Sequence, residues 1–175
     1  MAAQPAVADL ARLLDDPSEE IRESALDAIG DLGLPPEQLI PRVSKGLHDQ
    51  HADVRGRAMR ITRQLGPAAI ELVPTLISLA AREEDRRSVN RVLERLERYT
   101  VPAESVAEIR KLAEHDVSKV QLLAIRFLGL AGPAAAETVP MLRELKKHED
   151  EAVQVEASMA IEKIQASDLE IKGER

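Results

Sequence analysis

The chain has 175 residues, a formal net charge of −7 and no Cys, which excludes disulfides, thiolate zinc sites and a cysteine nucleophile. Hydrophobic residues make up 44% of it, yet it has no Trp, one Tyr and one Phe, so its core must be aliphatic, a composition that favours helices. No run of 18 apolar residues occurs and the N-terminal stretch lacks a basic start, so we expect neither a membrane span nor a secretory signal, and a cytoplasmic location.

Helical periodicity begins at once and is punctuated by turn residues. Residues 4–14 predict a first helix, and Ser18, followed by two Glu residues, predicts the start of a second helix that Gly33 ends. The apolar stripe expected to face the core on this second helix consists of Ile21, Ala25, Ala28, Ile29 and Leu32. Later helices are expected to end near Leu47, Leu65, Ala81, Tyr99, Glu114, Ala131, Lys147 and Ile164. The charged residues 83–85 are expected to form a turn, so that the next helix begins at Arg86.

The sequence repeats itself. LGPAAIELVPTLISL at residues 65–79 and AGPAAAETVPMLREL at residues 131–145 are identical at nine of fifteen positions. Such self-similarity at a fixed offset predicts a repeat architecture. We expect five helix–turn–helix units, of which the third is the least regular, followed by a polar tail that frays. The units are expected at residues 4–33, 34–66, 67–100, 101–132 and 133–164, and the tail at residues 165–175, where Leu169 and Ile171 could cover the last helix.

Proline also recurs with the repeat. Pro41, Pro74 and Pro140 are expected inside the first helix of three units, and each would bend that helix at the same place. The repeated Gly-Pro pairs at residues 66–67 and 132–133 are interpreted as turns that lead into the bent helices. Equivalent bends in successive units would keep neighbouring helices parallel along a curve.

Two stretches carry a family resemblance: DPSEEIRESALDAIGDLG at residues 16–33 and DVRGRAMRITRQLG at residues 53–66. Both resemble the turn and second helix of HEAT repeats, and the 33-residue period is similar to that of short bacterial-type HEAT repeats. The resemblance implies an all-α, right-handed α-solenoid of about five repeats, in which the second helices line the concave face. It also implies a ladder of Arg residues that bind turn Asp residues. We expect this ladder to be incomplete in the C-terminal half, where Gln121 and Gln154 replace Arg22 and Arg55.

Charge points to one part of the expected concave face. Residues 1–50 carry ten acidic and four basic side chains, whereas residues 51–100 carry seven acidic and ten basic ones, all Arg. A basic stretch in an acidic protein is a candidate surface for an anionic partner. The outward-facing positions expected to bind that partner are Arg60, Arg63, Arg87, Arg91, Arg98 and, at the rim, Arg126. The same arginines could instead form only a solvated face, with local pairs between Glu94 and either Arg91 or Arg98.

The sequence also leaves other functions open: nucleic-acid binding, an enzyme activity and a spacer role. Clustered Arg residues could contact nucleic-acid phosphates, but the chain is acidic overall and the groove lacks aromatic residues for base stacking. HEAT-like enzymes of the lyase, glycosylase and iron-dependent hydroxylase types exist, and the pairs His48-Asp49, His115-Asp116 and His148-Glu149 invite the last comparison. We expect these pairs to lie in successive turns about 10 Å apart, too far for one ion. A spacer segment of a larger protein is a further alternative.

The sequence therefore predicts a non-enzymatic protein-interaction scaffold that binds an acidic or extended protein or peptide on its concave face. We expect it to be a monomer or weak oligomer, and we expect no cofactor, no metal, no catalytic residues and no nucleic-acid partner. The sequence contains neither a Gly-rich loop that would bind nucleotide phosphates nor the G-x-S-x-G motif of a serine-hydrolase nucleophile.

Overall fold

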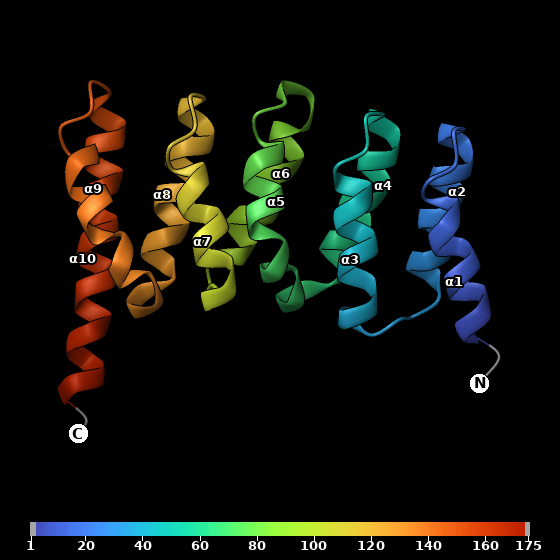
Figure 1. The fold of residues 1–175 in the computed structure, drawn as a ribbon, viewed down its shortest axis with the longest axis horizontal. Helices are drawn as coiled ribbons and strands as arrows, with labels where there is room; N and C mark the ends of the chain where they lie inside the picture. Colours follow the sequence, from blue (N-terminus) through green and yellow to red (C-terminus); the bar gives the residue numbers. More distant parts are fainter. Residues whose placement is uncertain (1–2, 174–175) are drawn as a thin grey trace.

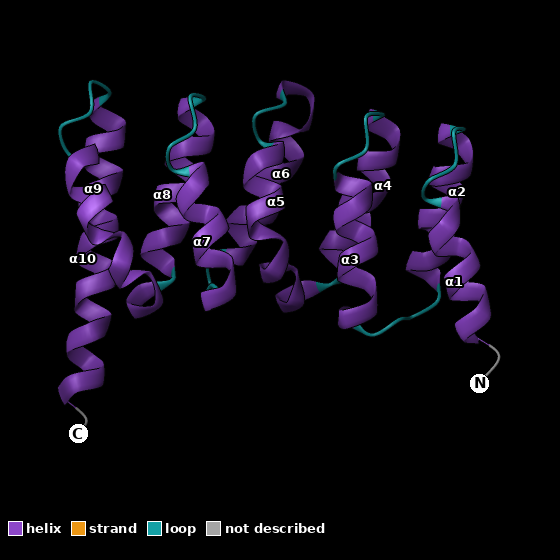
Figure 2. Cartoon of the chain, viewed as in Figure 1, coloured by secondary structure: helices purple, strands orange, loops and turns teal. Residues whose placement is uncertain are grey.

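The computed structural model describes the backbone of residues 3–173 and the side chains of residues 6–82 and 84–166. All regular structure in this part is helical (Figure 2), which confirms the predicted all-α class. None of the helices described is long and apolar enough to cross a bilayer. The α-helices are α1 (Ala3–Leu13), α2 (Glu19–Asp31), α3 (Pro36–Leu47), α4 (Ala52–Gln64), α5 (Val73–Leu79), α6 (Glu83–Leu96), α7 (Ala103–Leu112), α8 (Ser118–Leu130), α9 (Val139–Leu145) and α10 (Glu151–Gly173), and two 3₁₀ segments are η1 (Gly66–Leu72) and η2 (Gly132–Thr138).

The helices form five pairs arranged side by side as a solenoid. Figure 1 shows the pair α1–α2 at one end of the long axis and the pair α9–α10 at the other. Each pair packs internally, and the second helices α2, α4 and α6 contact one another in series, as do α8 and α10. A single aliphatic core runs from Leu14 to Ile164 and encloses Phe127. Each pair buries its apolar faces against its neighbours, which is how a repeat array gains stability.

Local chemistry sets most helix boundaries. Ser18 caps α2 through a 3.4 Å hydrogen bond from the backbone N–H of Ile21 to its hydroxyl oxygen. Gly33, Gly66 and Gly132 adopt positive φ where the chain passes from one pair to the next. The start of α6 differs from the expected Arg86, because α6 begins at Glu83. Acidic residues favour the first turn of a helix, so the charged stretch 83–85 continues the helix rather than forming a turn.

The structure confirms only one of the three predicted prolines in a helix interior. Pro41 does lie inside α3, as expected. Pro74 and Pro140, however, lie in the first turn of the short helices α5 and α9. The residues before them form the 3₁₀ segments η1 and η2 instead of an α-helical first half. Proline has no N–H for an α-helical bond to the preceding turn and fits best at a helix start, so each segment is divided at the proline.

The buried face of α2 is rotated from the expected stripe. Ala25 and Ile29 are buried as predicted, but Ile21 and Leu32 are 40% and 41% exposed, and Leu26 is buried instead. The equivalent of Ile21 in the next pair, Val54, is only 1% exposed. The difference arises because α4, which carries Val54, packs against the preceding second helix, α2. The helix α2, which carries Ile21, is the first of the second helices described and has no such helix before it.

A polar ladder joins the turns of the first three pairs. Arg22 donates from Nε to Asp49 Oδ2 at 2.7 Å and from Nη2 to Asp49 Oδ1 at 2.9 Å. Arg55, 1% exposed, makes the next step by donating to the carboxylates of Asp85 and Glu84. These steps correspond to the predicted Arg ladder.

The ladder ends where the sequence changes to Gln. Gln121 Nε2 donates to the carbonyl of Ala113 at 3.1 Å, and Gln154 Nε2 donates to the carbonyl of His148 at 2.7 Å. Each Gln amide therefore serves only the turn of its own pair and makes no link to the next pair. The expectation of an incomplete ladder in the C-terminal half is confirmed by these contacts.

The ladder also shifts the pKa values of Asp49 and Arg22. Burial by itself would raise the pKa of Asp49, but hydrogen bonds from Arg22 and from the backbone N–H of His51, together with the Arg22 charge, outweigh burial and lower it. The hydrogen bond to Asp49 raises the pKa of Arg22 in turn. The carboxylate is therefore held in its charged form at neutral pH.

The last helix is longer than the sequence suggested. A frayed tail was expected from residue 165, but α10 continues to Gly173. The predicted cap formed by Leu169 and Ile171 concerns side chains that lie outside the described residues. Ile164 is the last core residue among the side chains described, and the helix continues beyond it.

Candidate functional site: arginines of the second helices

The six predicted binding arginines divide into two groups once their contacts are known. All six lie on or directly after the second helices α4, α6 and α8. Two of them, Arg60 and Arg126, form ion pairs with neighbouring second helices. The other four, Arg63, Arg87, Arg91 and Arg98, are exposed and form no ion pair in the described part of the chain.

Arg60 belongs to a cluster that joins α2 to α4. Its guanidinium pairs with Asp27 of α2, and both side chains are about one-third exposed. Arg57 lies beside it and contacts Glu23 Oε2 and Asp27 Oδ2, each at 3.4 Å. The carboxylates of Glu23 and Asp27 in α2 therefore neutralise much of the positive charge of these two arginines. Arg60 is for this reason poorly placed to bind an external anion.

Arg126 plays the same part farther along the array. It donates from Nε and Nη2 to the carboxylate of Glu156 in α10 at 3.2 and 3.1 Å, and from Nη1 to Glu97 at 3.2 Å. The hydrogen bond from Arg126 to Glu156 is the main reason that the pKa of Arg126 is raised. Arg126 thus links α8 to α10 and to the end of α6.

Arg87 and Arg91 of α6, and Arg98 directly after its end, have no acidic partner among the described residues. The side chains of Arg87 and Arg98 form no hydrogen bond or ion pair with any described residue, and Arg91 has only a long 3.4 Å contact from Nε to the carbonyl of Arg87. The local pairs expected between Glu94 and its arginine neighbours are not formed in the described structure. Unneutralised positive charge is therefore concentrated on α6, between the paired clusters of Arg60 and Arg126.

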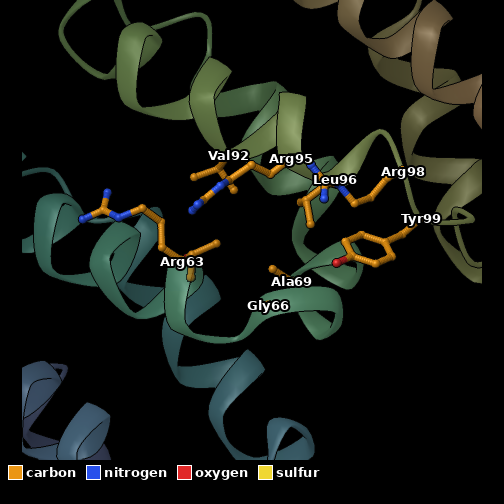
Figure 3. Close-up of a pocket in the computed structure, with 9 residues that line it drawn as sticks. Arg63, Gly66, Ala69, Val92, Arg95, Leu96, Arg98 and Tyr99 are labelled. Carbon is orange, nitrogen blue, oxygen red and sulfur yellow. The ribbon is translucent and has the colours of Figure 1, made fainter.

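A pocket of about 320 Å³ lies at one end of this charged surface, between the end of α4, the start of η1 and the end of α6. Figure 3 shows the hydroxyl of Tyr99 directed toward the space beside η1, the Arg95 side chain extending toward the side of Arg63, and Arg63 reaching out from the edge. Arg95 is not among the binding residues predicted from the sequence. The signal was available, since Arg95 lies between Arg91 and Arg98 on the expected outward side of the same helix.

The histidines have local structural roles. His115 Nδ1 and His148 Nδ1 each accept a 3.0 Å hydrogen bond from a backbone N–H two residues later, and His48 Nδ1 contacts the carbonyl of Ser44 at 2.8 Å. The residues with described side chains contain no group of three or more His, Asp or Glu able to hold a metal ion. Through these hydrogen bonds, the three histidines stabilise the turns that follow the first helices of their pairs.

The far end of the second-helix series is partly apolar. Leu122 of α8 is half-buried, whereas Val155 and Met159 of α10 are exposed. Val155 and Met159 line a shallow depression with Lys146 and Gln154. The surface of the second helices therefore runs from an acid–arginine cluster, through unpaired arginines, to an apolar end.

Comparison with known proteins supports the fold. The model of the HEAT repeat family matches residues 8–34, which span most of α1 and all of α2. No curated protein matches the sequence. A computationally designed armadillo repeat protein for modular peptide recognition is similar in structure, with 22% identity and a TM-score of 0.50 over 91% of this chain and 82% of that one.

Two further solved structures are similar. An engineered protein covers 95% of this chain and 82% of its own length, with 22% identity and a TM-score of 0.48. A designed armadillo repeat protein in complex with the peptide (KR)4 covers 91% and 82%, with 23% identity and a TM-score of 0.47. At 22% identity, the likeness to the designed protein with a TM-score of 0.50 concerns the fold alone. The family match confirms the predicted resemblance: this chain is an all-α repeat solenoid whose first helical pair matches the model of the HEAT repeat family.

Proposed function

We propose that this protein is a non-enzymatic interaction scaffold that binds an acidic, extended segment of another protein on the concave face formed by its second helices. The observation that carries the proposal is the contrast between paired and unpaired arginines. Arg60 and Arg126 neutralise acids of adjacent pairs, whereas Arg87 and Arg91 of α6 and Arg98 directly after it remain exposed without an acidic partner among the described residues.

The spacing on α6 suits an extended chain. Arg87 and Arg91 lie about one turn apart on the same side of α6, and Arg98 follows two residues beyond the end of the helix at Leu96. A guanidinium offers a planar fork of donors that matches a carboxylate, and charge-assisted bonds of this kind are stronger than neutral ones. An acidic peptide laid along α6 would meet each fork in turn.

A charge-reversal experiment tests the proposal. The double variant Arg87→Glu and Arg91→Glu should lose binding of a fluorescein-labelled acidic octapeptide of alternating Asp and Glu, measured by fluorescence anisotropy at low salt. The matched control is Arg110→Glu with Arg143→Glu, since both residues are exposed on first helices and the change in net charge is the same. Equal loss in both variants, or full binding by the α6 variant, would overturn the proposal.

The same assay distinguishes the proposed peptide binding from the main alternative, nucleic-acid binding. Single-stranded and duplex DNA of equal charge, added in place of the peptide, should bind more weakly than the peptide, because the exposed arginines are not interleaved with aromatic rings that stack on bases. Tight DNA binding with a steep dependence on salt would instead favour a nucleic-acid-binding protein.

A further inference from the structure

The third junction between helical pairs departs from the other three described. Gly33, Gly66 and Gly132 occupy equivalent positions, at offsets of 33 and 66, and each has a positive φ. Tyr99 stands at the corresponding position of the third junction, and no described residue other than Gly has a positive φ. The chain therefore takes another path after α6, without the left-handed residue of the other junctions and without the 3₁₀ segment that follows Leu65 and Ala131.

This irregular junction coincides with a pocket of about 320 Å³ beside η1. The volume lies at the lower end of the range for small-ligand sites, roughly 300–1,000 Å³. Tyr99 lines the pocket together with Arg95 and Arg98 from the end of α6 and Arg63 from the end of α4. Tyr99, which departs from the repeat, thus forms part of the cavity wall, opposite the regular junction at Gly66.

The polar lining of the pocket is cationic. Arg63, Arg95 and Arg98 contribute three guanidinium groups, the hydroxyl of Tyr99 adds a donor, and no carboxylate lines the cavity. None of these three arginines has a hydrogen-bonding or ion-pair partner among the residues described. Like charges gathered around one cavity repel one another, so an anion bound between them would be stabilised.

The remaining lining is apolar. Ala69, Val92 and Leu96 are buried and, with the ring of Tyr99, give the pocket a hydrocarbon wall beneath its charged rim. An inorganic anion would leave this wall uncovered. A ligand with an apolar or aromatic stem and an anionic head would use both parts of the lining.

The charge indicates which head group fits. A carboxylate carries one negative charge, whereas a phosphomonoester carries about 1.5 to 2 at neutral pH and presents three strong acceptor oxygens. Three guanidinium groups and a phenolic hydroxyl match the larger charge and the greater number of acceptors. We propose that this pocket binds a phosphomonoester with an apolar or aromatic stem, held by Arg95, Arg98 and Tyr99 with Arg63 at the edge.

This inference requires no protein partner, although Arg63 and Arg98 also belong to the surface proposed to bind an acidic peptide. The phosphomonoester itself has two sources, a free small molecule or a phosphorylated side chain. The chemistry of the pocket is the same for both. Arg95 and Tyr99 belong to the pocket alone, so they distinguish this inference from the proposed function.

The protein carries its own reporter for the test. Tyr99 is its single tyrosine and there is no Trp, so tyrosine fluorescence reports on the pocket alone. Titration with hexyl phosphate, which does not absorb in the tyrosine region, should change this fluorescence saturably at about 20 mM salt. Inorganic phosphate and hexanoate should bind at least about tenfold more weakly, a difference of about 1.4 kcal/mol.

Variants locate the response. Arg95→Gln with Arg98→Gln should weaken hexyl phosphate binding at least about tenfold, whereas the control Arg87→Gln with Arg91→Gln, which has the same charge change on the same helix, should leave it unchanged. Circular dichroism of each variant checks that the helices are intact. No saturable response, equal loss in the control, or unchanged binding by the Arg95 and Arg98 variant would overturn the inference.

Two further arms complete the experiment. Neutral peptides with a phosphotyrosine or a phosphoserine, compared with hexyl phosphate by calorimetry, show whether a side chain or a small molecule binds more tightly, and either order supports the phosphomonoester site. If hexyl phosphate fails to bind while the acidic octapeptide binds, the pocket inference alone is wrong. If the octapeptide fails and hexyl phosphate binds, only the proposed function is wrong.

Discussion

Arg22 of α2 holds the carboxylate of Asp49 through two hydrogen bonds of 2.7 and 2.9 Å, across the boundary between the first and second helical pairs. The same guanidinium donates from Nη1 to the carbonyls of Asp16 and Pro17 in its own turn. One side chain therefore ties two successive turns together. Arg22 and Asp49 are only 7% and 12% exposed, so water competes weakly for their hydrogen bonds.

Substituting Asn for Asp49 tests this link. Asp49→Asn keeps an oxygen that can accept from the backbone N–H of His51 but removes the charge that Arg22 binds. We expect a loss of about 1.5–3 kcal/mol in the free energy of unfolding, the range for a hydrogen bond to a charged group. Urea unfolding followed by circular dichroism measures it. Asp116→Asn is the matched control, because Asp116 occupies the corresponding turn of the fourth pair without an arginine partner. The control should change stability by less than about 0.5 kcal/mol.

The same carboxylate predicts a dependence on pH. The pKa of Asp49 is lower in the folded protein than its ordinary value, so its contribution to stability is complete above the unfolded pKa of about 3.9 and is lost as the pH falls through the folded value. The stability difference between the wild type and Asp49→Asn should therefore be constant from about pH 7 to pH 5 and shrink below about pH 4. Urea unfolding at a series of pH values measures it. A difference that grows with acidity would contradict the assignment.

Close packing of α8 on α10 predicts a second destabilising change. A Cβ added at Gly129 would lie 2.9 Å from the backbone Cα of Ala160, which has no freedom to move aside. Gly129→Ala should cost about 1–3 kcal/mol, as overpacking does. Gly56 of α4 is the control, since nothing lies within 4 Å of its added Cβ, and Gly56→Ala should stabilise by about 0.5–1 kcal/mol. Thermal unfolding measures both, and a Gly129→Ala protein as stable as the wild type would refute the close approach.

The division between paired and unpaired arginines predicts opposite outcomes for stability. Arg126→Gln removes contacts with Glu97 and Glu156, and because Arg126 is 40% exposed we expect a loss of only about 1 kcal/mol, smaller at high salt. Arg87→Gln removes no described contact and should leave the free energy of unfolding unchanged within about 0.5 kcal/mol. Urea unfolding at about 0.05 and 0.5 M NaCl compares them. Equal losses in both variants would show that Arg87 has a structural role.

Much of the fold could be predicted because the relevant signals are local. The Ser18 cap, the glycine at position 33 and the 33-residue period mark helix ends without reference to distant residues. The register of the third pair was harder, since the acidic stretch at residues 83–85 is compatible with both a turn and a helix start. Pro74 likewise predicted a bend but not the 3₁₀ segment in front of it.

The candidate site could be predicted only in outline. Helical spacing places Arg60, Arg87 and Arg126 on the outward side of their helices, yet spacing along one helix says nothing about the charge of the next. Arg60 meets Asp27 and Arg126 meets Glu156 because successive second helices lie side by side. Arg87 has no such neighbour.

The sequence by itself determined the helical class, the repeat and the excess of arginine between residues 51 and 100, because periodicity, turn residues and charge are properties of neighbouring positions. Only the tertiary structure decided which arginines are neutralised, because an ion pair depends on distances between residues about 30 positions apart. It also decided that Arg95, Arg98 and Tyr99 share a cavity with Arg63. The cavity lies between the end of α4, the start of η1 and the end of α6, and its shape depends on how these elements pack against one another.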